Sequence, residues 1–359
     1  MIRAATGMHY GASPDPRHAR EAVSRAISKL GGHTVGSVLL FLSPAYAFEP
    51  QAALREAAKV AGTVQVFGCC AMGLITEEDW VLDAEGATAM VFTPEAGLQA
   101  LTIMLQRSIE PSSVLTLSSP NAAEIAINQY KHPKFGAVVT DEYGHGPFSL
   151  WQSGKIVEHE YSLVAFDPSL DIQFLRADSI AAISAPLQLN KANGFSLEQI
   201  ELEPAIKNLN RYSQNQGETL CAVSNNNDPN FIERGDYELF HVIGHDADNG
   251  TVKLSGSARA GRYLVWAKRE PQTAQHNLTK AIELFKNEQP AQPKFGLMFN
   301  NISRGPEFYN GKDQDLALFQ DAFPSTPLIG FYSNAEIAPN INNNSVIHHH
   351  SSLLALCVW

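Results

Sequence analysis

Four residue groups in this 359-residue chain could do chemistry: a histidine on an apolar face, charged side chains beside strand ends, two tyrosines near them, and adjacent cysteines. His241 lies in the segment 236–245, DYELFHVIGH. Strand alternation gives it apolar neighbours on one face, namely Tyr237, Leu239 and Ile243. A histidine in that setting is either a hydrogen-bonded core residue or a ligand, and the sequence leaves both interpretations open.

Arg304 and Glu336 each lie beside the end of a predicted strand, where loops often carry function. The two side chains could pair with each other. Alternatively, Arg304 could hold a ligand carboxylate through its bidentate guanidinium group. Tyr309 and Tyr332 could then donate hydrogen bonds in the same pocket.

Cys69 and Cys70 follow a predicted strand and could provide a nucleophile, but no neighbouring base supports that role, and buried thiols are common. The sequence also lacks a nucleophile elbow, a phosphate-binding loop, a dinucleotide fingerprint and an H-E-x-x-H motif. We therefore predict no catalytic residue and no enzymatic activity. A cysteine-dependent enzyme is the least favoured alternative.

Composition restricts the partners. The 26 Lys and Arg against 37 Asp and Glu give a formal charge of −11, and no basic cluster interrupts this acidic balance. Nucleic acid and anionic membrane are therefore not expected as partners. The first twenty or so residues lack an apolar signal core, and no apolar run approaches the ~20 residues that span a bilayer. We expect a cytoplasmic protein with reduced thiols.

Hydrophobic periodicity predicts short buried strands alternating with helices. Residues 36–42, 63–67 and 237–243 are predicted strands, 50–61, 197–208, 274–285 and 316–323 are predicted helices, and His245 is placed in a turn. Residues 65–75 and 327–337 resemble each other, since each reads as an apolar strand followed by a glycine and small residues. The predicted fold class is therefore α/β (α+β) with two related lobes, each a mixed β-sheet flanked by helices. The predicted domains are residues 1–190 and 191–359.

These segments resemble the FIST family, two-part sensory proteins with an N-terminal and a C-terminal FIST domain. The matching residues are Gly68, Cys69, Gly73 and Ile75 in the first half, then Arg304, Gly305, Phe308, Tyr309 and Gly311 of an R-G-x-x-F-Y-G pattern, and finally Gly330, Phe331, Glu336, Ile337 and Pro339. The resemblance implies a ligand-binding sensor in signal transduction.

The first half departs from the family pattern. Cys70 and Ala71 replace a hydroxyl pair, and Leu74 replaces a glutamate, which favours an apolar or partly apolar ligand. One branch of the family consists of haem-binding nitric oxide sensors that act on histidine kinases. The resemblance therefore implies non-covalent haem with His241 as its metal ligand, Arg304 beside a propionate, and a histidine kinase or another signalling protein as partner. The alternative is a sensor of an amino acid or similar small metabolite, with Arg304 and Glu336 as polar anchors.

Overall fold

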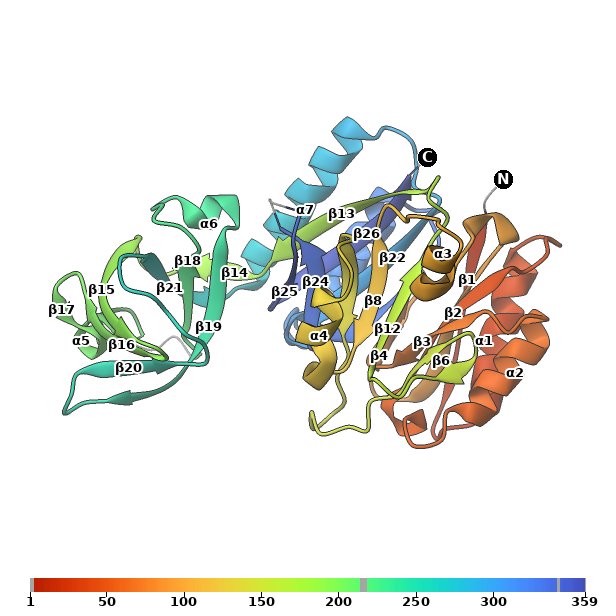
Figure 1. Ribbon diagram of the computed structural model, residues 1–359, viewed down its shortest axis with the longest axis horizontal. Helices are drawn as coiled ribbons and strands as arrows, with labels where there is room; N and C mark the ends of the chain where they lie inside the picture. Colours follow the sequence, from red (N-terminus) through yellow and green to blue (C-terminus); the bar gives the residue numbers. More distant parts are fainter. Residues whose placement is uncertain (1–2, 214–217, 341–342, 359) are drawn as a thin grey trace. The chain divides into compact units, whose positions relative to one another are not determined.

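The computed structural model describes residues 3–213, 218–340 and 343–358 (Figure 1). The chain forms two compact units. Met1–Asp178 and Gln275–Trp359 build the first, called here the three-sheet unit. Ser179–Ala274 build the second, called the inserted unit because its sequence interrupts the first. The predicted domain boundary between residues 190 and 191 lies within the inserted unit, and it stays a prediction.

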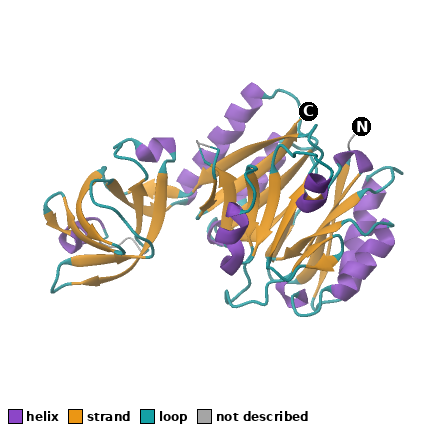
Figure 2. Cartoon of the chain, viewed as in Figure 1, coloured by secondary structure: helices purple, strands orange, loops and turns teal. Residues whose placement is uncertain are grey.

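The described part of the three-sheet unit contains three six-stranded sheets that share one strand order (Figure 2). Each sheet is built around a parallel pair, β2–β3, β8–β9 or β22–β23, with antiparallel neighbours on both sides. The first sheet has the order β1-β6-β2-β3-β10-β11, the second β7-β12-β8-β9-β24-β25, and the third β13-β26-β22-β23-β4-β5. The mixed α/β class with helix-flanked sheets is confirmed, and the repeated pattern occurs three times.

The chain passes through this pattern in three successive copies. The strands of the first copy are β1 Ala4–Gly11, β2 Ser37–Leu42, β3 Val66–Cys70, β4 Met72–Thr76, β5 Trp80–Val81 and β6 Glu85–Phe92. Those of the second are β7 Gln99–Ala100, β8 Val114–Ser118, β9 Lys134–Val138, β10 Leu150–Gln152, β11 Lys155–Ile156 and β12 Tyr161–Ala165. Those of the third are β13 Asp171–Asp178, β22 Phe295–Asn301, β23 Leu328–Ser333, β24 Ala335–Pro339, β25 Ser345–His348 and β26 Ser351–Val358. In every copy the fourth and fifth strands pair with the sheet of another copy, so the copies are interlocked.

Two helical connections precede the second and third strands of each copy. The helices are α1 Pro16–Lys29 and α2 Gln51–Ala61, α3 Leu101–Gln106 and α4 Ala123–Asn128, and α7 Pro271–Glu288 and α8 Gln314–Ala322. Short 3-10 turns follow four of the strands, β2, β6, β8 and β22: η1 Pro44–Tyr46, η2 Pro94–Ala96, η3 Pro120–Ala122 and η4 Ile302–Arg304. The predicted helices 50–61, 274–285 and 316–323 correspond to α2, α7 and α8.

A single apolar core joins the three sheets, because side chains from β2, β8 and β22 belong to one buried cluster. Phe92 lies on β6, Phe166 directly follows β12 and Phe295 lies on β22, and their ring centroids are 5.1–5.8 Å apart. The other faces of the sheets pack against the helices, with α1 and α2 on the first sheet and α7 and α8 on the third. Each sheet is therefore covered on both sides, which explains its short, almost fully apolar strands.

One glycine in each sheet allows a very close backbone approach. A Cβ atom at Gly68, Gly136 or Gly330 would lie 1.9, 2.0 or 1.8 Å from a carbonyl oxygen of the adjacent parallel strand. Those distances exclude every side chain unless the strand moves. The resemblance between residues 65–75 and 327–337 reflects this constraint, and Gly136 is the third instance.

The inserted unit is a small antiparallel barrel. Its pairings form a closed ring in the order β21-β15-β16-β20-β19-β18, with β18 returning to β21. Its elements are β14 Ile180–Ala182, β15 Leu187–Asn193, β16 Ser196–Ile200, β17 Glu203–Pro204, α5 Ala205–Tyr212, β18 Leu220–Ser224, α6 Phe231–Arg234, β19 Tyr237–Asp246, β20 Thr251–Leu254 and β21 Tyr263–Arg269. The predicted helix 197–208 is wrong up to residue 204, where two strands lie, and His245 belongs to β19 rather than to a turn.

We predict that Gly330→Ala lowers the free energy of unfolding by roughly 3 kcal/mol or more, because the new methyl group collides with the Met298 carbonyl oxygen. Urea denaturation of the purified chain measures this. Gly244→Ala is the matched control, since its Cβ meets nothing within 4 Å. Equal stability of the two variants would contradict the role assigned to Gly330.

Candidate functional site

Arg304 is fully buried in η4, directly after β22. Its Nε and Nη2 donate to the two carboxylate oxygens of Asp315 at 2.7 and 2.8 Å, and its Nη1 donates to the Ala177 carbonyl at 2.6 Å. Tyr309 donates its hydroxyl to the same aspartate at 2.9 Å. The acidic partner of Arg304 is thus Asp315 on α8 rather than Glu336, and the guanidinium group is used to hold α8 and β13 together.

Tyr332 makes a parallel contact on β23. Its hydroxyl donates to Asp313 at 2.5 Å, and Asp313 also accepts the Leu316 backbone N–H at 2.9 Å as the N-cap of α8. Burial, followed by the neighbouring Asp315 carboxylate, raises the pKa of Asp313 to about 6. Three predicted site residues, Arg304, Tyr309 and Tyr332, therefore meet around two aspartates that sequence reasoning missed. The available signal was the D-x-D spacing at the predicted start of a helix.

Glu336 lies apart from these contacts, fully buried on β24. Its carboxylate accepts hydrogen bonds from the Ser333 hydroxyl at 2.6 Å and the Ser351 hydroxyl at 2.5 Å. It forms no ion pair with any residue that the structure describes. Burial raises the pKa of Glu336 to about 7, although the serine hydrogen bonds act in the opposite direction.

Polar side chains continue this hydrogen-bond network toward the first residue of β26, Ser351. Asn301 hydrogen-bonds to Glu336 and also accepts the Ser303 hydroxyl at 2.6 Å. The same hydroxyl lies 2.7 Å from Nδ1 of His350. The sequence pattern did not indicate this network, because its members come from separate strands and carry no shared motif.

His241 belongs to the inserted unit, whereas the other four predicted residues belong to the three-sheet unit. Its side chain on β19 is 42% exposed, and its Nδ1 lies 2.7 Å from a Glu218 carboxylate oxygen. The other oxygen of Glu218 contacts Arg269 at 3.2 Å. A haem-ligating imidazole needs an apolar wall that excludes water. The charged, half-exposed surroundings of His241 therefore do not fit an enclosed haem.

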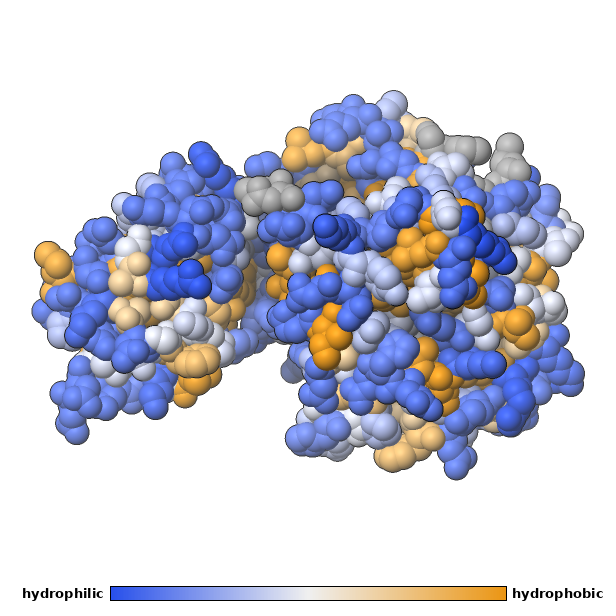
Figure 3. All heavy atoms as spheres, in the orientation of Figure 1, coloured by the Kyte–Doolittle hydropathy of each residue, from blue (hydrophilic) through white to orange (hydrophobic). Residues whose placement is uncertain are grey.

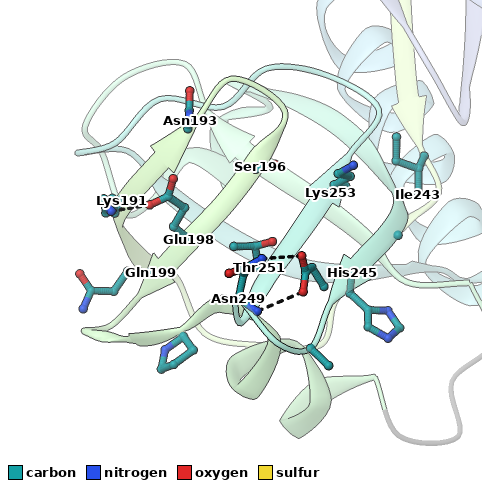
Figure 4. A pocket seen from close by; sticks show the side chains of 14 residues that line it. Lys191, Asn193, Ser196, Glu198, Gln199, Ile243, His245, Asn249, Thr251 and Lys253 are labelled. Atoms are coloured by element: carbon teal, nitrogen blue, oxygen red, sulfur yellow. Dashed lines mark hydrogen bonds and ion pairs between the residues drawn. The ribbon is translucent and has the colours of Figure 1, made fainter.

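A cavity with a volume of about 1240 Å³ lies on the inserted unit (Figure 4). Strands β15, β16, β19 and β20 supply most of its wall, and hydrophilic residues cover most of the visible surface of this unit (Figure 3). Its lining is Lys191, Asn193, Ser196, Glu198, Gln199, Pro204, Ile243, Gly244, His245, Asp246, Ala247, Asn249, Thr251 and Lys253. No residue of the predicted site lines it.

Comparison with known families decides the identity. The FIST N domain model matches residues 37–201, and the FIST C domain model matches residues 205–339. The chain belongs to the FIST family. FIST domains are sensory ligand-binding domains, so the chain is a signal-transduction sensor of small ligands. No curated protein matches it in sequence.

The structure gives the FIST signature residues physical roles. In the R-G-x-x-F-Y-G segment, Arg304 and Tyr309 bind Asp315, while Gly311 takes a φ of 102°. The described residues contain no group of three or more His, Cys, Asp or Glu side chains that could hold a metal ion. Within the described ranges, no helix is both long and apolar enough to cross a membrane.

We predict that Glu336→Gln flattens the dependence of stability on pH. Because the folded pKa of about 7 exceeds the ordinary value of 4.5, this group's contribution is complete below about pH 4.5 and is lost as the pH rises to about 7. The free energy of unfolding of the natural chain should therefore fall by a few kcal/mol relative to the variant over that range. Asp313 changes stability in the same direction in both proteins, so the difference isolates Glu336.

Urea titrations at several pH values measure this difference. Glu49→Gln, at an exposed position, is the control and should leave the pH profile unchanged. A constant stability difference between the natural chain and Glu336→Gln from pH 4.5 to 7 would show that Glu336 does not take up a proton.

Proposed function

We propose that this FIST protein senses a polar small metabolite that binds in the inserted-unit cavity. One observation carries the proposal: this cavity of about 1240 Å³ is lined mainly by polar and charged side chains of the inserted unit. Arg304, Tyr309 and Tyr332 already hold α8 through buried hydrogen bonds, so a ligand would have to break an ion pair to reach them. Because these three side chains are already hydrogen-bonded, a ligand-binding site elsewhere is favoured.

The chemistry of the lining supports a polar ligand over an apolar one. Cavities of roughly 300–1,000 Å³ commonly hold metabolite-sized ligands, and this cavity exceeds that range because it is open to solvent. Ile243, Ala247 and Pro204 are its principal apolar members, and hydroxyl, amide, ammonium and carboxylate groups make up most of the rest. An amino acid or a similarly charged metabolite meets complementary groups here.

The output is proposed to pass to a signalling protein, with a histidine kinase as the expected partner. The formal charge of −11 supports a protein partner over nucleic acid or an anionic membrane. A cytoplasmic location accords with the four cysteines, which are all free and buried.

Haem-based nitric oxide sensing is the second candidate function. A single contact favours it: Nδ1 of His241 is held by the Glu218 carboxylate, as is usual for metal-ligating histidines. The exposure of the ring argues against an enclosed haem. Visible absorption during titration with haem tests this candidate, and a Soret band that stays identical to that of free haem would contradict it.

We predict that at least one member of a panel of amino acids, dicarboxylates and sugar phosphates raises the melting temperature. A ligand at 100-fold its dissociation constant adds ~2.7 kcal/mol to the free energy of unfolding, which thermal-shift measurements detect. The matched variant is Gly244→Val, which fills the cavity beside β20 at a position where an added Cβ meets nothing within 4 Å. Protection that survives this substitution, or no protection by any compound, would contradict binding in this cavity.

A further inference from the structure

We infer that Lys253 anchors an oxyanion group of the ligand, either a carboxylate or a phosphate, in the inserted-unit cavity. The inference rests on the proposed function and adds the chemical class that the cavity recognises. It concerns one face of β20, where Lys253 and Thr251 line the cavity and the intervening Val252 is buried in the barrel core.

The strands on both sides of Lys253 place small residues directly opposite it. Its cross-strand partner on β16 is Ser196, and its partner on β19 is Gly244. Directly opposite side chains lie about 4.5–5.5 Å apart at Cβ, so these two positions decide what the lysine contacts first. Neither supplies a carboxylate. Lys253 therefore has a serine opposite it on one strand and a glycine opposite it on the other.

Gly244 leaves space at this point of the cavity wall. A Cβ placed on it meets no heavy atom within 4 Å, and its backbone is not in the left-handed region. The residue is thus neither required for a turn nor for close packing. Its effect is to leave open a niche beside Lys253 that is large enough for a ligand group.

The acidic residues of the cavity are engaged by other groups. Glu198 contacts Lys191 at 2.6 Å, which neutralises that pair (Figure 4). Asp246 accepts the backbone N–H groups of Asp248 and Asn249 and the Asn249 side-chain amide. These hydrogen bonds, with the Asn249 backbone bond first, lower the pKa of Asp246, and the nearby positive charge of Lys253 acts in the same direction.

Lys253 is consequently the lysine of the cavity without an ion pair to any residue that the structure describes. Ser196 and Thr251 add hydroxyl donors on the same face. An ammonium group with hydroxyl donors suits a carboxylate or a phosphate, for which lysine acts as a point charge. Recognition of an oxyanion follows from this charge and these donors.

The experiment titrates the full chain with inorganic phosphate, succinate and neutral succinamide, measured by calorimetry. We expect Lys253→Met to weaken binding of the bound anion at least tenfold. Lys191→Met, the control on the same face, should change binding less than twofold because Glu198 already neutralises it. A chain that binds phosphate but not succinate recognises a phosphate group, and the reverse result indicates a carboxylate. Succinamide should not displace the bound anion.

The outcomes separate this inference from the proposed function. If a panel compound binds and Gly244→Val abolishes binding while Lys253→Met does not, the cavity is the site but the oxyanion inference is wrong. Equal affinity for succinate and succinamide leads to the same conclusion. If neither anion binds the natural chain in a Lys253-dependent manner and no panel compound gives protection, both are overturned.

Discussion

The three-sheet unit depends on one steric constraint, the approach of a strand to its parallel neighbour at Gly68, Gly136 and Gly330. Each glycine lets a carbonyl oxygen come within 2.0 Å of the position where a Cβ would be. Further along the chain from each glycine, the next strand pairs with another sheet, and at Gly68 this change is abrupt because β3 ends at Cys70 and β4 begins at Met72. Because each copy contributes strands to the sheet of another copy, the three small sheets surround one apolar core. No single sheet could enclose that core alone.

The two units differ in where their polar side chains lie. The three-sheet unit covers both faces of its sheets, and its buried ion pair between Arg304 and Asp315 is satisfied within the unit. The inserted unit is a barrel whose interior is filled by apolar side chains, so that polar residues are left for its outer face. Side chains on this outer face can therefore change without disturbing either core.

Sequence reasoning was most successful where a residue has one local physical reason for its position. Gly68 and Gly330 identify equivalent strands, and the alanine spacing of residues 50–61 identifies α2. It failed at 197–208, where the 3.6-residue periodicity of apolar side chains coincides with strands facing a curved barrel core. The cavity was out of reach because it combines residues from several strands with no motif, and Asp315 was missed because its partner lies on another element.

The charged signature of the family follows from the place of the insertion. Counting from the residue opposite Gly68, Gly136 or Gly330, the corresponding positions in the three copies are Tyr46, Ala122 and Arg304. Only the third copy is interrupted after its first strand, at residues 178 and 179. Arg304 donates to the carbonyl of Ala177, at the point where β13 ends and the inserted sequence begins. β13 has to stay in its sheet although the chain continues from its end into the inserted unit. It therefore needs a stronger attachment than the tyrosine or alanine at the corresponding position of the other copies provides. A buried bidentate ion pair supplies that attachment, which explains why a residue that resembles a ligand anchor in the sequence is a structural one.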